Sequence, residues 1–346
     1  MGTFFFSIML IIGIAIVFDF SENLDDIIEK QVSAKEVIFD YYFNFIPYYV
    51  NLFLFLFVFI SVIFFTSKMA AKSEIIAILS TGISFRRLLY PYFVSAFVLA
   101  IMSLILGNFI IPPANKVRLK FEGDYLRHRH YNNERNMHKQ ISPGVYLYIE
   151  FYAVNTDIAH KFSIEKYENK RLVSKLVSTS ARWDTTKNKW NVSNYYIREY
   201  GEKEDILKYG KSIDTAINIY PEDFKRTLTD ITTLDYFELN DFIAEQRLYG
   251  TKNIDAFLLE KYRRLAFPFS TFILSFIGVS LASRKVKGGT GLNIGIGLLI
   301  SFMYILFMQI SDQFTIKGNF PPLLSVWTPN IIFTIVAYFV YRLAPK

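Results

Sequence analysis

The sequence predicts a polytopic α-helical membrane protein with six transmembrane helices and one inserted all-β domain. The chain is 52% hydrophobic and 18% aromatic, with 35 Phe among its 346 residues. A soluble domain is about 45–50% apolar, and much of that share comes from Ala and Gly rather than from Phe. Here the apolar residues gather in long runs, whereas a central stretch alternates between apolar and polar residues. The long runs indicate membrane spans, and the alternation indicates strands.

Six runs are long enough to cross a bilayer, which takes about 20 apolar residues in a helix. They are residues 3–20, 45–66, 88–111, 265–283, 291–311 and 323–341. No small-residue cleavage site follows Val17, so the first run is expected to be a span rather than a removable signal. Ionisable residues are nearly absent inside the runs, and Asp19 and Asp312 sit at their ends. Carriers driven by protons or sodium ions place such groups at membrane depth, so the driving energy should come from elsewhere.

The charges of the short loops set the expected orientation. The loop 67–87 is basic, whereas the stretch 21–44 on the opposite side is mostly acidic. Short loops rich in Lys and Arg stay in the cytoplasm, so both chain ends are expected there and the central block outside. We therefore expect spans one to three with a cytoplasmic helix at about 73–81 (residues 1–111), an outer β domain (112–230), connecting helices (231–264) and spans four to six (265–346).

The cytoplasmic loop after the second run, KMAAKSEIIAILSTGISFRRLLYP, reads as a short helix held at the membrane surface. Ser73 is expected to cap its first turn through the side-chain hydroxyl, and Glu74 sits where a carboxylate favours the helix dipole. Gly82 fits the position just past the helix end, where a left-handed backbone is needed. Arg86 follows, just before the apolar run resumes.

One face of this helix is apolar, because Ile75, Ile78 and Leu79 fall three and four residues apart. A half-apolar helix in the cytoplasm is suited to docking into the groove of another protein. The alternative is a helix that lies on the lipid headgroups without a protein partner.

The central block is predicted to be a sandwich, jelly roll or barrel of short strands. In Gly144–Tyr152 the residues Val145, Leu147, Ile149 and Phe151 alternate with polar or aromatic neighbours and should face one way. Residues 168–170 are expected to form a turn, 172–183 a strand pair, and 184–189 a hairpin. Farther along, Asn240 is expected to cap a short helix that Gly250 closes.

The sequence contains no recognisable motif for a catalytic or metal site. There is no cysteine, and neither the Walker spacing nor a hydrolase motif occurs. The four histidines are His128, His130, His138 and His160. Neighbouring arginines would repel a cation, so we expect no metal site there. The net charge of +7 is explained by topology and lipid headgroups rather than by nucleic acid. We therefore expect a non-enzymatic chain that depends on a separate ATPase.

Three segments together resemble one family. They are Ser73–Pro91, Ile111-Pro112-Pro113-Ala114-Asn115 and Arg263-Arg264-Leu265-Ala266-Phe267-Pro268. In order and spacing the chain is similar, over nearly its whole length, to the LptF/LptG permeases of the lipopolysaccharide exporter. The resemblance implies a permease subunit of an ABC transporter in the bacterial inner membrane. Such a subunit extracts lipopolysaccharide and passes it to a periplasmic bridge.

The resemblance also implies partners and roles. The partners would be an LptB-type ATPase dimer, a second LptF/LptG-type permease, LptC and an LptA-type bridge protein, together with lipopolysaccharide and membrane lipids. The chain would need no cofactor, because the ATPase uses the ATP. The central domain would be a periplasmic jelly roll, and spans one and five would form lateral gates. Ser73, Glu74, Ile78, Gly82 and Arg86 would belong to the segment that couples to the ATPase.

For the substrate, the resemblance points to basic residues beyond the first span. Lys30 and Lys35 lie there and would engage the phosphorylated head of the lipid. In the alternative interpretation Glu29 and Glu36 pair with the two lysines, and exposed pairs of this kind are worth about 0–1 kcal/mol.

Rival functions remain open at this stage. One is the permease of another lipid- or lipoprotein-exporting ABC system, which usually has four spans. Another is a membrane-anchored envelope enzyme that acts through its outer domain, and a third is a sensor with an outer ligand-binding domain.

Overall fold

The computed structural model describes residues 2–126, 135–201, 204–225, 228–250, 254–285, 289–318 and 320–344. It divides into two compact units. The helical unit comprises Met1–His128, Thr232–Tyr236 and Asp255–Lys346, and the β unit comprises Arg129–Ile231 and Phe237–Ile254.

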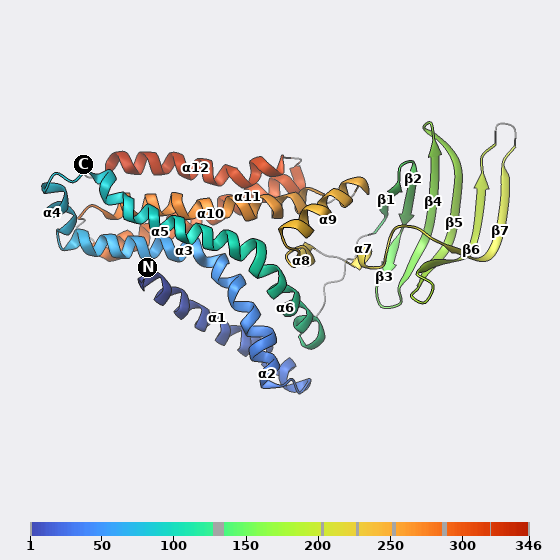
Figure 1. Cartoon of the computed structure of the whole chain (residues 1–346), viewed down its shortest axis with the longest axis horizontal. Helices are drawn as coiled ribbons and strands as arrows, with labels where there is room; N and C mark the ends of the chain where they lie inside the picture. Colours follow the sequence, from blue (N-terminus) through green and yellow to red (C-terminus); the bar gives the residue numbers. More distant parts are fainter. Residues whose placement is uncertain are drawn as a thin grey trace. The chain divides into compact units, whose positions relative to one another are not determined.

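Among the described residues of the helical unit, six helices are long and apolar enough to span a membrane, which confirms the predicted architecture. Their helical segments are α1 (Gly2–Glu29), α2–η1–α3 (Ala34–Glu36, Val37–Tyr42 and Phe43–Ala71), α5–η2–α6 (Phe85–Ile105, Leu106–Ile110 and Ile111–Tyr125), α10 (Ile254–Ala282), α11 (Gly289–Gly318) and α12 (Pro322–Leu343). The start of α1, the end of α12 and the short helix α4 (Glu74–Ser80) lie at the same end of this unit (Figure 1).

Two of the spanning helices are longer than a bilayer is thick. The second runs for 38 residues and the third for 41, or about 57 and 62 Å at 1.5 Å per residue. The boundary expected at residue 112 therefore lies inside a helix. The apolar run ends at Ile111, but Ile111, Ala114, Arg118 and Phe121 continue one buried face at helical spacing. Pro112 does not stop the helix, because it occupies the first turn of α6.

Buried polar side chains join the last three spans. The Tyr304 hydroxyl donates to Asn330 Oδ1 at 3.0 Å, and Asn330 Nδ2 donates to the Ala266 carbonyl at 3.0 Å. Ser311 Oγ donates to the Ser325 carbonyl at 2.7 Å. That carbonyl lacks the usual N–H partner four residues later in its own helix, because Pro329 has no N–H. Bonds of this kind hold helices together in a membrane, where apolar contact alone gives little preference for protein over lipid.

The glycines Gly291, Gly295 and Gly297 of α11 differ in their surroundings. A Cβ on Gly297 would lie 2.3 Å from Ile63 Cδ1 of α3, so this glycine does permit a close helix contact. Gly291 and Gly295 have no other atoms within reach and are exposed among the described residues.

The β unit contains one seven-stranded antiparallel sheet. Its strands are β1 (Met137–Ser142), β2 (Val145–Ile149), β3 (Phe151–Ala153), β4 (Ile158–Glu168), β5 (Arg171–Asp184), β6 (Lys189–Glu199) and β7 (Ile206–Thr215). The order is β1-β2-β4-β5-β6-β7, with β3 also paired to β4. Neighbours in the sheet are thus close to consecutive in the chain, which is an up-and-down order. A jelly roll instead has crossed connections between two sheets.

The core of the β unit lies on one face of the sheet around Trp190, which is fully buried. Its indole nitrogen donates to the Ile219 carbonyl at 2.8 Å. Ile219 and Phe224, just before and within α7 (Glu222–Lys225), are buried in the same cluster. The helices α8 (Leu228–Ile231) and α9 (Tyr236–Leu248) follow.

The predicted alternation over Gly144–Tyr152 is right for the first half and wrong for the second. Leu147 and Ile149 are buried, but Phe151 is exposed and Tyr152 is buried. The inversion occurs where the chain bends at Glu150 and where Lys161, on the paired strand, has a φ of 51°. The left-handed Lys161 reverses the faces of the side chains that follow it on β4, opposite the inversion at Glu150. Alternation within a single strand does not predict such a reversal.

Other local predictions divide in the same way. The turn at 168–170 and the hairpin at 184–189 are present, with Asn169 and Lys170 both at positive φ. The stretch 172–183 is one long strand, β5, rather than a strand pair. Asn240 lies inside α9 and does not cap it, while Gly250 has the left-handed backbone expected of it.

Candidate functional site

The predicted loop helix is present as α4, Glu74–Ser80. Gly82 has a φ of 85°, as predicted, and its N–H donates to the Leu79 carbonyl at 3.1 Å. Ser73 precedes the helix but forms no side-chain capping bond, because its own backbone is left-handed with a φ of 62°. The capping prediction was therefore wrong, and the sharp turn from α3 into α4 is made at Ser73.

The apolar face of α4 is turned toward the protein's own spans. Ile75 is 1% exposed, and Ile78 is half-buried. Leu79 packs against a cluster formed by α5, α10 and the end of α12, which includes Phe85 and Val279. This corrects the expectation that this face is free to enter a partner's groove. It instead fixes α4 rigidly to the ends of three spans.

The opposite side of α4 is the part that is free. Glu74, Ile76, Ala77 and Ser80 are exposed, and we name these four residues the α4 ridge. Ile76 is 53% exposed, which is high for a large apolar side chain. The sequence signal for it was its position outside the three-and-four spacing of the buried residues. Arg86 is also exposed, at the second residue of α5.

The charges of this surface have no partners within the described residues. Neither Glu74 nor Arg86 forms a salt bridge there. A basic residue at a helix N-terminus opposes the helix dipole, so Arg86 does not serve the stability of α5. Its position is instead what the topology rule places at a cytoplasmic helix end.

Lys30 and Lys35 lie at the far end of the helical unit, between α1 and η1. Both are exposed. Lys30 Nζ donates to the Asp124 carbonyl at 3.4 Å, while the Glu36 carboxylate accepts from the Ser33 N–H at 3.2 Å. No lysine–carboxylate pair with Glu29 or Glu36 forms within the described ranges, so the pairing alternative has no support in the geometry.

The sequence did not predict a buried polar cluster that joins α10 and α11. Arg263 of α10 forms an ion pair with Asp312 of α11, whose side chain is only 5% exposed. Arg264 Nε donates to Glu260 at 3.1 Å, and Glu260, Arg263 and Arg264 line a cavity of about 190 Å³ with Tyr48. The available signal was the pair of arginines at 263–264, which precedes an apolar run. Asp312 had been placed at a span end, and the structure shows it buried and paired.

Each of the two histidines that the structure describes packs against an aromatic ring. His138 packs on Tyr148 with ring centroids 4.7 Å apart, and His160 stacks on Phe151 at 4.3 Å. His128 and His130 lie outside the described residues. Within the described part of the chain, no group of three or more His, Cys, Asp or Glu side chains is arranged to hold a metal ion.

Comparison with known proteins agrees with this arrangement. A model of the family described as "Lipopolysaccharide export system permease LptF/LptG" matches residues 1–343. The chain belongs to the LptF/LptG family. No curated protein matches it.

Membership in the LptF/LptG family fixes the general role. LptF/LptG proteins are lipopolysaccharide export permeases and non-catalytic transport subunits. With its six apolar helices, this member is a multi-pass protein of the inner membrane. Membership also implies partners from the same export system.

Proposed function

We propose that this chain extracts lipopolysaccharide from the inner membrane as one permease half of an ABC exporter, with ATP hydrolysis supplied by a separate LptB-type ATPase dimer. The observation that carries the proposal is the form of α4. The buried side of this helix packs against spans. Its exposed ridge carries the unpaired carboxylate of Glu74 and the exposed side chain of Ile76. Such a surface suits a partner that must transmit movement.

The coupling follows from the packing. Leu79 packs α4 against the ends of α5, α10 and α12, so a displacement of α4 would displace those helices. Glu74 would pair with a basic group of the ATPase, and Ile76 would fill an apolar pocket beside it. The contribution of the other predicted residues is structural. The left-handed backbones of Ser73 and Gly82 form the turns before and after α4, and Ile78 is half-buried on its packed side. Arg86 would contact the partner or the lipid phosphates at the helix end.

The Glu74→Lys and Ile76→Asp variants test this coupling. Each should lower the amount of ATPase that co-purifies with the chain, and the lipid released per ATP hydrolysed, by about tenfold. Loss of one interfacial contact worth about 1.4 kcal/mol gives that factor. Glu22→Lys, at an exposed acid of α1 far from α4 in sequence, is the matched control. Unchanged recovery and unchanged coupling in both test variants would remove α4 from this role.

The low burial of two spans supports the proposal that a second permease packs beside this one. The apolar windows of α1 and α11 are only 17% and 22% buried, less than those of the other four candidate spans. These are spans one and five, the proposed lateral gates. In the assembled exporter they would face the second LptF/LptG-type permease, LptC and the lipid that enters between them.

Lys30 and Lys35 would hold the phosphorylated head of the lipid as it leaves the membrane. Both amines are exposed and free of carboxylate partners in the described structure, which leaves their charge available. The β unit, on the periplasmic side, would pass the acyl chains to an LptA-type bridge protein. Reversing both charges should lower photocrosslinking of lipopolysaccharide to this region, and unaltered crosslinking would contradict the role.

A further inference from the structure

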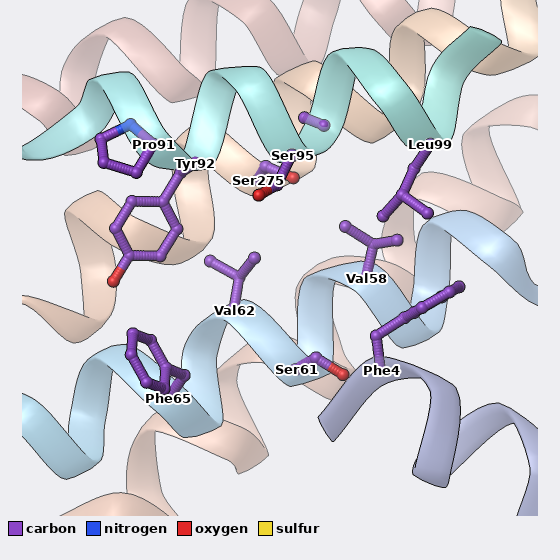
Figure 2. A pocket seen from close by; sticks show the side chains of 11 residues that line it. Phe4, Val58, Ser61, Val62, Phe65, Pro91, Tyr92, Ser95, Leu99 and Ser275 are labelled. Carbon is purple, nitrogen blue, oxygen red and sulfur yellow. The ribbon is translucent and has the colours of Figure 1, made fainter. Parts of the chain in front are cut away.

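A second cavity of about 190 Å³ lies between α3 and α5 (Figure 2). Phe4 of α1 closes one end, and Phe65 and Tyr92 stand at the other. Phe4 is buried, whereas Phe65 and Pro91 are exposed, so the cavity opens toward the ends of α3 and α5 that flank α4. All of its lining residues belong to spans, so the molecules that reach it are those dissolved in the membrane.

Three serines, Ser61, Ser95 and Ser275, line this otherwise largely apolar space, and the hydroxyls of two of them are buried without a partner in the part of the chain that the structure describes. Ser61 of α3 is 7% exposed and Ser275 of α10 is 4% exposed, and neither Oγ has a hydrogen-bond partner among the described residues. Serines in helices can donate to the carbonyl one turn earlier, and these two do not. Leaving a buried donor unpaired costs about 1–3 kcal/mol. An occupant with an acceptor oxygen would remove that cost.

Basic side chains stand beyond the open end of the cavity on the same two helices. Lys68 of α3 and Arg86 and Arg87 of α5 are exposed, and none of them forms an ion pair within the described residues. Lys68 is seven residues after Ser61, or about 10 Å along the helix. Long basic side chains reach across such a distance to a phosphate at the membrane surface.

We propose that this cavity binds one acyl chain of a glycerophospholipid from the leaflet on the α4 side. A phosphate would meet Lys68, Arg86 and Arg87, an ester carbonyl would accept from the hydroxyls of Ser61 and Ser275, and an alkyl chain would lie along the apolar lining. The lipid is distinct from the exported one and does not depend on the export role. Held between α3 and α5, it sets the spacing of the helices on which α4 is seated.

Retention of added lipid tests this site on the full chain in mild detergent. Native mass spectrometry should show one dioleoyl phosphatidylglycerol retained per chain, and much less dioleoylglycerol, which lacks the phosphate. The double variant Ser61→Ala/Ser275→Ala should lower retention about tenfold, because two hydrogen bonds within a membrane protein are worth roughly 0.6 kcal/mol each. Ser301→Ala is the matched control, since Ser301 has a buried unpaired hydroxyl on α11 outside this cavity.

Blocking the cavity gives a second readout. Ser95 lines the cavity from α5, so Ser95→Phe places a ring in the space. Phosphatidylglycerol with a diazirine in its acyl chain should label peptides of α3 and α5 in the unmodified chain but not in Ser95→Phe. Three results overturn the proposal: equal retention in all variants, equal retention of dioleoylglycerol, or labelling that maps to α11 and α12 instead. Each variant is compared at equal recovery of monodisperse chain, which separates loss of the site from loss of the fold.

Discussion

Replacement of Arg263 by methionine is expected to lower the free energy of unfolding of the helical unit by about 3–5 kcal/mol, the usual cost of leaving one member of a buried ion pair without its partner. The Asp312 side chain is 5% exposed, and Arg263 is its hydrogen-bonding partner in the described structure. The other carboxylate oxygen of Asp312 already has none. Thermal unfolding in detergent, followed by the recovery of monodisperse protein, measures the loss.

The opposite substitution should cost less. The Arg263 side chain is 39% exposed and lies 3.8 Å from Glu260, so Asp312→Leu leaves the guanidinium partly exposed and beside a second carboxylate. The double variant Arg263→Met/Asp312→Leu should be more stable than Arg263→Met alone, because no buried charge then remains unpaired. Equal losses in both single variants, with simple addition in the double variant, would contradict a coupled pair.

The sequence was sufficient for the parts of the fold that depend on composition and length. The six spans follow from apolar runs, and the loop helix follows from the spacing of Ile75, Ile78 and Leu79. The direction of that apolar face could not be read from the spacing. A half-apolar helix fits a partner's groove or its own protein equally well, and only the positions of Phe85 and Val279 decide between them.

Contacts between distant residues were also beyond the sequence. Asn293 Nδ2 donates to Ser67 Oγ at 2.8 Å, although the two residues are 226 positions apart in the sequence. The local sequence around either residue does not predict this contact. The inversion at Glu150 and Lys161 depends on a positive φ at a lysine, a conformation that residue type does not predict. The apolar spacing of α4 did not identify Ile76 as a contact residue. A residue outside that spacing is predicted to be exposed, and the spacing does not predict that it contacts a partner.

Replacement of Trp190 by alanine should destabilise the β unit by about 3–5 kcal/mol, the range for truncating a buried aromatic side chain. Trp190 is 0% exposed, and the rings of Trp183 and Phe224 lie 5.3 and 6.0 Å from it. The substitution also removes the donor to the Ile219 carbonyl. Tyr209→Ala is the matched control, because Tyr209 is 75% exposed on β7 and its loss should change stability by about 0.5 kcal/mol or less.

Limited proteolysis of the full chain shows where the Trp190→Ala destabilisation falls. The β unit has its own hydrophobic cluster, and the clusters of the spans are formed by other residues. Units with separate cores unfold separately. Cleavage should therefore increase within residues 135–225, while the spans remain intact. Simultaneous loss of both units would show that Trp190 also supports the membrane part, and that the inserted sheet is not an independent module for receiving lipid.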